Sequence, residues 1–410
     1  MNTIFALIQK EKHHFERISR NAQRLVISFF MYGLGVPLIT TFTNAFIWSN
    51  SHNFASVIVY NIGSWVTLPI MYFTNGVLLQ FIPAPLLYTF GLILTASAPV
   101  IVIMFSLKGL ISMFLVGIIF GMGWGFYWSN RTFYTLRNTE DLNRNYFYSL
   151  TFTIDIITGI VVPFIIGWVI VLGGNLSYRI LAILLFITYL TAGLTTLKLS
   201  MDPSEHAHGI VTKIKGKWNL MRCISFFFGF QSGTNLVLPS LMILYLLGNE
   251  GILGTVSSFG ALLSAFSIYQ IGKIALTHHR IRIFALGVTV LVIATAMLAL
   301  YPSNLGIVMY VVGTAITANF TWSSYNPMLM RLIDQYTPTK KQNRFKYIVD
   351  HEVFLNMGRI TGVGIFFLLY SFSSKLLALR FTPVIITSFQ VLVLFLLKKI
   401  VKQSDYQNNV

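Results

Sequence analysis

The chain has 410 residues, of which 55% are hydrophobic and only 10% are charged. A soluble protein of this length needs a more polar surface, so the composition excludes a water-soluble globular domain and indicates a membrane protein. The formal net charge of +17 would suit a nucleic-acid binder if the basic residues formed one patch, but their distribution along the chain argues against that interpretation.

Apolar stretches long enough to cross a bilayer recur along the whole chain. A spanning helix needs about 20 mostly apolar residues, and about twelve segments meet this requirement. In chain order we predict that these spans are centred near Pro37, Val66, Thr95, Ile119, Val161, Phe186, Asn235, Ala261, Leu291, Thr314, Gly364 and Leu392. The predicted fold class is therefore an all-α membrane protein with twelve transmembrane helices.

The basic residues lie mostly on one side of the predicted spans. With the N-terminus assigned to the cytoplasm, 24 of the 29 Lys and Arg residues fall in cytoplasmic segments, Arg359 falls within a span, and four lie outside, Lys108, Arg179, Lys375 and Arg380. This asymmetry is what the positive-inside rule describes. We therefore expect a multi-pass protein of the bacterial plasma (inner) membrane with both termini cytoplasmic, and no nucleic-acid partner.

The longest interruption between spans divides the chain into two parts. We predict a six-helix half at 1–199, a cytoplasmic linker at 200–217 and a second six-helix half at 218–410. The linker histidines have no Cys or carboxylate at ligand spacing beside them, so we expect no metal. A phosphate-binding Gly-rich loop and a nucleophile elbow are both missing from the sequence, so we expect neither a cofactor nor an enzymatic activity.

One segment occurs twice. Trp128-Ser129 runs through to Leu136-Arg137, and Trp322-Ser323 runs on to Met330-Arg331. Each copy is followed by a polar loop with an Asn-Arg pair, at 143–144 and 343–344, and then by a helix that contains ionisable residues. Such an internal repeat in an apolar chain indicates a transporter whose substrate path lies between pseudo-symmetric halves.

Twelve helices in two halves joined by a cytoplasmic linker resemble the major facilitator superfamily over essentially the whole chain. The stretches 127–131, 143–147 and 351–359 are similar to the poorly characterised YQGE-type branch of that superfamily. The resemblance implies a major facilitator fold and alternating access, in which the two halves rock about a central site and move a small solute. The sequence departs from the family in the loop after the second helix, where Gln80 stands in place of the usual acid.

The polar groups inside the spans are the candidates for coupling. A charge in lipid is costly, so an ionisable side chain within a span is expected to face the protein interior or an aqueous path. Two stripes have the spacing i, i+4, i+7 of one helical face: Thr151, Asp155 and Thr158 in the first half, and Glu352, Asn356 and Arg359 in the second.

These stripes have two interpretations. In the first, Asp155 and Glu352 include the proton-titrating group, and Arg359 adjusts its pKa. In the second, Glu352 and Arg359 belong to a cytoplasmic gate or form an ion pair at a helix end. The sequence leaves both interpretations open.

The superfamily resemblance places the substrate cavity on the first, fourth, seventh and tenth helices. Tyr127 with Arg131, and Gln231 with Asn235, are i, i+4 pairs that share a helical face. Trp at the end of a span is alternatively an interfacial anchor, and Arg131 is alternatively a snorkelling residue. The candidate cavity residues are Asn44, Tyr127, Trp128, Arg131, Gln231, Asn235, Asn319, Trp322 and Asn326.

Aromatic and amide side chains with few charges suit a neutral or amphipathic solute better than a phosphate or a dicarboxylate. We therefore expect a monomeric, proton-coupled secondary transporter whose partners are a small solute, protons and the lipid bilayer. Export is favoured slightly because Gly159, Pro163 and Gly167 resemble an exporter signature, although the same spacing suits plain helix packing. The alternatives are an uncoupled facilitator or lipid-moving protein, and a receptor or scaffold that transports nothing.

Overall fold

The computed structural model describes residues 15, 19–138, 141–199, 211, 216–272, 279–337 and 344–408. Within these residues every regular element is a helix. The elements are α2 (Arg20–Pro37), η1 (Leu38–Phe42), α3 (Thr43–Ser51), α4 (Phe54–Leu78), α5 (Ala84–Phe105), α6 (Leu110–Asn138), α7 (Asp141–Thr196), α8 (Lys217–Leu246), α9 (Glu250–Gly272), α10 (Arg280–Leu300), α11 (Asn304–Tyr336), α12 (Arg344–Phe372) and α13 (Lys375–Asn408).

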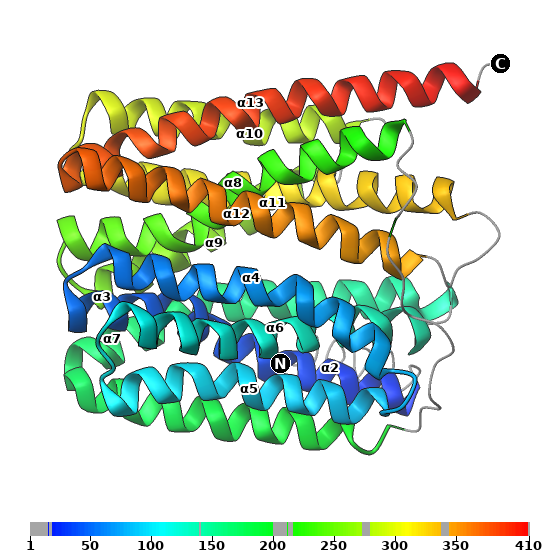
Figure 1. The fold of residues 1–410 in the computed structure, drawn as a ribbon, viewed down its shortest axis with the longest axis horizontal. Coiled ribbons are helices and arrows are strands. Elements are labelled where there is room, and N and C mark those ends of the chain that lie inside the picture. The colour runs from blue at the N-terminus through cyan, green and yellow to red at the C-terminus, as the bar shows by residue number, and fades with distance from the viewer. Residues whose placement is uncertain are drawn as a thin grey trace, which may run out of the picture.

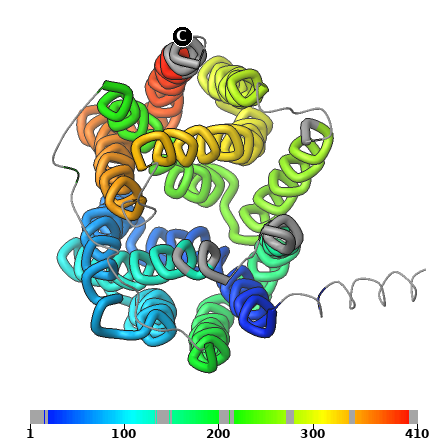
Figure 2. The backbone as a smooth tube through the Cα atoms, turned by 90° about the vertical axis from the view of Figure 1, so that its right-hand side faces the viewer, coloured from blue at the N-terminus to red at the C-terminus, as the bar shows by residue number. Residues whose placement is uncertain are grey.

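The helices form two groups that follow the order of the chain. Helices α2 to α7 occupy the lower part of Figure 1 and α8 to α13 the upper part, and Figure 2 shows the same division from one end. We call these groups the first and second halves. Helix α4 packs against α12, and α7 packs against α9, so these two pairs form much of the boundary between the halves.

The two ends of the molecule differ. The end on the left of Figure 1 carries the turns at 52–53, 106–109, 247–249, 301–303 and 373–374, and we call it the short-turn end. The opposite end carries the connection between α7 and α8, and we call it the linker end. Most of the predicted linker lies outside the described residues, apart from Val211, Gly216 and Lys217.

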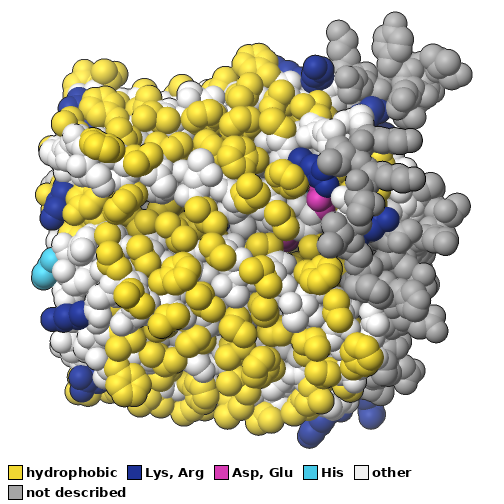
Figure 3. All heavy atoms as spheres, in the orientation of Figure 1, with side chains coloured by type: hydrophobic (Ala, Val, Ile, Leu, Met, Phe, Trp, Pro, Cys, Tyr) yellow, Lys and Arg dark blue, Asp and Glu magenta, His cyan; other side chains and the backbone are white. Residues whose placement is uncertain are grey.

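Hydrophobic side chains cover most of the face seen in Figure 3, and cationic side chains gather towards its two ends. Among the described residues, 11 helices are long and apolar enough to cross a membrane. The stretch Leu150–Thr196 counts once, although its 47 residues exceed the length that one span requires about twofold. Gly174 interrupts α7 with a positive φ of 53°, which glycine tolerates. The predicted number of twelve holds only if the two arms of α7 are counted separately.

The first span is not a regular α-helix. Pro37 has no amide hydrogen, so it cannot donate the usual hydrogen bond to the preceding turn. The next five residues, Leu38–Phe42, form the π-helix η1. There the Thr43 hydroxyl donates to the carbonyl oxygen of Leu38 at 2.6 Å. Single π turns inside helices often occur at functional sites, so this break marks a place to look for a ligand pocket.

Glycines bring α8 and α12 into backbone contact. A Cβ added to Gly358 would collide with the carbonyl oxygen of Phe226, and one added to Gly233 would lie 2.7 Å from the Cα of Arg359. This close approach sets the position of the Glu352 stripe against α8.

The predicted Asn-Arg loops are only partly visible. Asn143 and Arg144 lie inside α7, so this part of the predicted first loop is helical, but their side chains are outside the description. Asn343 also lies outside the described residues, whereas Arg344 begins α12 and pairs with Asp334 at 2.8 Å.

Candidate functional site

A chain of hydrogen bonds crosses the second half from α8 through α11 to α12. Ser225 donates to the carbonyl of Met221 at 2.8 Å, and its oxygen lies 2.8 Å from the Tyr325 hydroxyl. The Tyr325 oxygen lies 2.9 Å from Nε2 of His351. Because Ser225 uses its single proton on Met221, Tyr325 must donate to Ser225, and His351 must then donate from Nε2.

This proton assignment leaves Nδ1 of a neutral His351 as an acceptor. It lies 4.0 Å from Oε1 of Glu352, whose side chain is 17% exposed. His351 itself is only 4% exposed. The structure buries His351 between Tyr325 and Glu352, with its imidazole beside the carboxyl group.

The chain continues along the predicted stripe on α12. Asn356 donates from Nδ2 to Oε2 of Glu352 at 3.1 Å and accepts from Nη1 of Arg359 at 3.0 Å. Arg359 also donates from Nε to the hydroxyl of Ser232 on α8 at 3.1 Å. Asn356 is completely buried and therefore stands between the two charged groups. In the part of the chain that the structure describes, no ion pair joins Glu352 directly to Arg359.

In the first half, the charged residues Arg131 and Asp155 form a direct ion pair. Arg131 on α6 donates from Nη2 to Oδ2 of Asp155 at 3.1 Å and from Nη1 to the Tyr127 hydroxyl at 3.0 Å. Its guanidinium lies 4.4 Å from the ring centroid of Phe29 and 5.1 Å from that of Trp128, within cation–π range. The Arg131 side chain is 14% exposed and that of Asp155 is 44% exposed, so the ion pair is open on its acidic side.

Aromatic packing fixes this first-half cluster. Tyr32 stacks on Tyr127 with ring centroids 3.7 Å apart. The Tyr32 hydroxyl accepts from Nε1 of Trp124 at 2.8 Å, and its carbonyl oxygen accepts from the Tyr189 hydroxyl at 3.0 Å. Rings that are stacked and hydrogen-bonded in this way form a wall with little freedom to move.

Tyr72 on α4 connects the two clusters across the boundary. It packs in one hydrophobic cluster with Trp124 and Trp128 of the first half and with Val349 of the second. Phe345 and Ile348 of α12 pack against the same cluster. Sequence reasoning missed Tyr72 because a tyrosine in an apolar helix carries no signal of its neighbours on another helix.

A pocket of about 280 Å³ lies on the boundary where η1 meets the second half. The lining residues come from η1, α8, α9 and α11. The polar ones carry a hydroxyl or an amide: Thr40, Thr41, Asn235, Ser240, Ser257 and Thr314. The others are apolar: Leu236, Pro239, Leu253, Val311, Ala315 and Ala318. Its volume is near the lower limit for small-molecule sites. We call it the boundary pocket.

Two predicted cavity residues, Asn44 and Gln231, do not line the boundary pocket but form hydrogen bonds to residues that do. Asn44 donates to the carbonyl of Leu236 at 2.9 Å and accepts from Asn61 at 2.9 Å, so it joins the first half to α8. Gln231 donates to Oδ1 of Asn235 at 2.6 Å, as their predicted shared face requires. The pair therefore orients the one amide that lines the pocket.

The structure does not bring all predicted cavity residues into one site. Tyr127, Trp128 and Arg131 belong to the first-half cluster described above. On α11, Asn319 donates to Ser264 at 2.6 Å, and Trp322 packs edge-on against Phe228 with centroids 4.8 Å apart. Asn326 on the same helix is exposed. Sequence spacing relates residues only within one helix, so it did not predict which of these candidate cavity residues lie near one another.

The repeated Trp segments also diverge in chemistry. Arg131 follows Trp128 by three positions, and Tyr325 follows Trp322 by three positions. Arg131 contacts Asp155 on the next helix of its half, whereas Tyr325 contacts His351. The repeated segment thus has a cation, Arg131, in the first half and a hydroxyl group, that of Tyr325, at the matching position in the second half.

The halves are joined at the short-turn end. Glu250 at the start of α9 accepts from the Ser49 hydroxyl on α3 at 3.3 Å and from the Tyr178 hydroxyl on α7 at 3.1 Å. Gly167 of the predicted exporter signature packs on the backbone of Glu250, and the carbonyl of Pro163 contacts Gly254. In this structure the signature residues Pro163 and Gly167 are therefore packing residues between the halves.

Residues 24–362 match the Major Facilitator Superfamily. The chain belongs to this superfamily. The match covers most of the sequence and confirms the resemblance to this superfamily that the sequence analysis stated. It also makes the protein a multi-pass membrane transporter rather than an enzyme.

Relatives and solved structures agree with this assignment. "Uncharacterized protein YqgE" of Bacillus subtilis (strain 168) is 26% identical over 346 residues, which are 83% of this chain and 80% of that protein. The nucleoside transporter NupG has a TM-score of 0.67 at 14% identity, covering 94% of this chain and all of the other. A bacterial homologue of the iron transporter ferroportin, solved in an inward-facing state, has a TM-score of 0.65 at 13% identity, covering 93% of this chain and 98% of that chain. At these low identities the solved structures support only the fold. They do not indicate which substrate this chain moves.

Proposed function

We propose that the chain is a proton-coupled secondary transporter that moves a small, neutral or amphipathic solute by alternating access. The observation that carries this proposal is the boundary pocket, because its walls come from both halves of the molecule. A rocking motion of the halves would open and close such a pocket. Its threonine, serine and asparagine groups suit a solute that offers hydroxyl or amide groups, and its aliphatic residues suit an apolar part.

Glu352 is the proposed proton carrier. Asp155 is paired directly with Arg131, whereas Glu352 contacts Arg359 only through Asn356. Protonation of Glu352 would be supported by the free Nδ1 of His351. Loss of the proton would draw the Arg359 guanidinium towards the carboxylate, and this movement would alter the packing of α12 on α8 and on Tyr72.

In the proposed orientation the protein spans the bacterial inner membrane with its linker end on the cytoplasmic side. We also propose that it acts as a monomer. The basis of the orientation is the excess of Lys and Arg in the segments assigned to that side. With Glu250 joining the halves at the short-turn end, the boundary pocket would be reached from the cytoplasmic side in this state. Export stays the favoured direction on the Gly159 to Gly167 pattern alone.

A solute screen tests the proposed pocket. Purified protein is screened for thermal stabilisation, since a ligand that binds only the folded state raises its apparent stability. We expect a hit to bind Asn235→Leu at least about tenfold more weakly, a loss of about 1.4 kcal/mol, and to bind the matched variant Asn326→Leu unchanged. Equal binding to the wild type and Asn235→Leu would remove the pocket from the proposal.

Transport of the same hit in proteoliposomes tests coupling. The liposomes are prepared with and without a pH gradient, and solute movement is measured in both. We expect the gradient to drive accumulation against the solute concentration. Movement at equal rates with and without the gradient would favour an uncoupled facilitator.

A further inference from the structure

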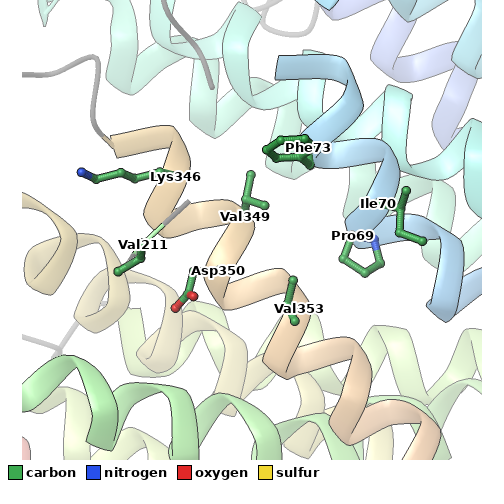
Figure 4. Close-up of a pocket in the computed structure, with 8 residues that line it drawn as sticks. All are labelled: Pro69, Ile70, Phe73, Val211, Lys346, Val349, Asp350 and Val353. Carbon is green, nitrogen blue, oxygen red and sulfur yellow. The ribbon is translucent and has the colours of Figure 1, made fainter. Parts of the chain in front are cut away.

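A second cavity, distinct from the boundary pocket, opens between α4 and α12. Its volume is about 390 Å³. Figure 4 shows Pro69, Ile70 and Phe73 of α4 on one side and Val349 and Val353 of α12 on the other. We call it the α4–α12 crevice. Its walls are hydrocarbon side chains, so it offers an unbranched apolar group many contacts and offers water very few.

The crevice has two charged lining residues, and one of them is already neutralised. Asp350 accepts two hydrogen bonds from Arg222, at 2.7 and 2.5 Å, and a third from Nε1 of Trp218 at 2.7 Å. Lys346 is the other, and its ammonium lies 5.4 Å from the ring centroid of Tyr347. Among the described residues Lys346 has no acidic partner, and Figure 4 shows its ammonium pointing away from α4, so this positive charge lies at the rim of the crevice and not between its walls.

The position of Lys346 matches the level of phospholipid headgroups. It lies in the first turn of α12 at the linker end, beside an aromatic group in which Trp218 and Tyr347 have centroids 4.7 Å apart and Tyr336 and Tyr347 have centroids 5.9 Å apart. Tyrosine and tryptophan concentrate at the membrane interface. From Lys346 the crevice extends along α12 to Val353, about 10 Å at 1.5 Å per residue.

The crevice is open towards the hydrocarbon. Ile70 on one wall is 53% exposed and Val353 on the other is 37% exposed, and both lie within segments apolar enough to span a membrane. An aqueous solute would not reach these side chains directly from the lipid side. An acyl chain of a neighbouring lipid would.

We propose that the α4–α12 crevice is a binding site for an anionic phospholipid. One acyl chain lies between α4 and α12, and the phosphate pairs with Lys346. The lipid therefore occupies the boundary between the halves beside Val349, which also contacts Tyr72. It is a resident ligand of the transporter, separate from the solute in the boundary pocket.

Lipid binding is measured by native mass spectrometry of the purified full chain with phosphatidylglycerol and phosphatidylcholine of equal chain length. We expect the wild type to retain phosphatidylglycerol preferentially, by about fivefold or more, as an added charge contact of about 1 kcal/mol implies. Lys346→Gln is expected to lose that preference. The matched variant Lys398→Gln removes an exposed positive charge from α13 near the linker end and is expected to keep it.

Filling the crevice tests the acyl-chain position. Ile70→Trp and Val353→Trp each place a large ring in the crevice from opposite walls. Circular dichroism and size exclusion establish that each variant is folded, and whichever one folds is used. We expect it to bind both lipids less and to lose cross-links from a photoactivatable phosphatidylglycerol to 69–73 and 349–353.

Three outcomes would overturn the proposal. The first is an unchanged phosphatidylglycerol preference in Lys346→Gln, and the second is an equal loss in Lys398→Gln. The third is protein-dependent lipid scrambling in liposomes that the crevice-filling variant abolishes, because the crevice would then be a lipid transport path. None of these readouts uses solute transport, so they do not depend on the proposed function.

Discussion

The two halves contain a repeated sequence segment, but their charged side chains are paired in different ways. In the first half, Arg131 pairs directly with Asp155 and is covered by aromatic rings. In the second half, Asn356 separates Glu352 from Arg359, and the imidazole of His351 lies beside the carboxyl group. A direct ion pair favours one arrangement, whereas a separated pair is able to change its contacts when a proton arrives. This difference is the basis of our proposal that the second half, and not the first, responds to protons.

The largest expected effect concerns how the second half is fastened. Gly358 lies against the backbone of Phe226 on α8, which cannot rotate away, whereas Gly33 in the first half meets the Thr158 side chain. We expect Gly358→Ala to destabilise the protein by about 1–3 kcal/mol through overpacking, more than Gly33→Ala does. Thermal unfolding in one detergent measures both variants.

Gly364→Ala is the control for that comparison, because it lies on the same helix and a Cβ there would meet no atom within 4 Å. Its melting temperature should stay within error of the wild type or rise slightly. If all three variants melted together, the close α8–α12 contact would not hold the polar chain in place.

The next effect concerns the hydroxyl that links α11 to α12. Tyr325→Phe leaves the Nε2–H of buried His351 without its partner, which we expect to cost about 1–3 kcal/mol. In the first half, Tyr88→Phe removes a hydrogen bond to Ser28, but Ser28 keeps its bond to the Ala192 carbonyl at 3.0 Å. That loss should be about 1 kcal/mol. Chemical denaturation or thermal unfolding of the two variants measures the difference, and a larger loss for Tyr88→Phe would reverse the comparison.

The smallest effect concerns the first-half ion pair. Asp155 is 44% exposed, and exposed ion pairs contribute within about 1 kcal/mol. We expect Asp155→Asn to change stability by less than this amount and to leave gradient-driven transport intact. Failure of this variant to transport, with normal folding, would show that the first half also carries a titrating group.

The overall fold was predictable because a bilayer requires long apolar segments and a biased distribution of positive charge. Both features can be read directly from the amino-acid sequence. The all-α fold and the superfamily were predicted and are confirmed. Among the described residues 11 elements are long and apolar enough to span a membrane, and α7 counts once among them although Gly174 breaks it. Hydropathy predicted two spans on either side of this glycine, centred near Val161 and Phe186.

The sequence predicted relations between site residues only where both residues lie on the same helix. Spacing predicted that Tyr127 shares a helical face with Arg131 and that Gln231 shares one with Asn235. The side chains of each pair form a hydrogen bond. It did not predict that Arg131 would reach Asp155 or that Tyr72 would pack beside the second half. These contacts join separate helices, and their register depends on packing such as the Gly358 contact with α8.

The most direct measurement compares gradient-driven uptake and solute counterflow in proteoliposomes for Glu352→Gln and Asp155→Asn, using a hit from the solute screen. Counterflow needs alternating access but no gradient, so it reports folding and solute binding in the same preparation. We predict that Glu352→Gln lowers gradient-driven accumulation by at least about tenfold while it retains counterflow, and that Asp155→Asn retains both. Full accumulation in Glu352→Gln, or its selective loss in Asp155→Asn, would contradict the assignment of coupling to the second half.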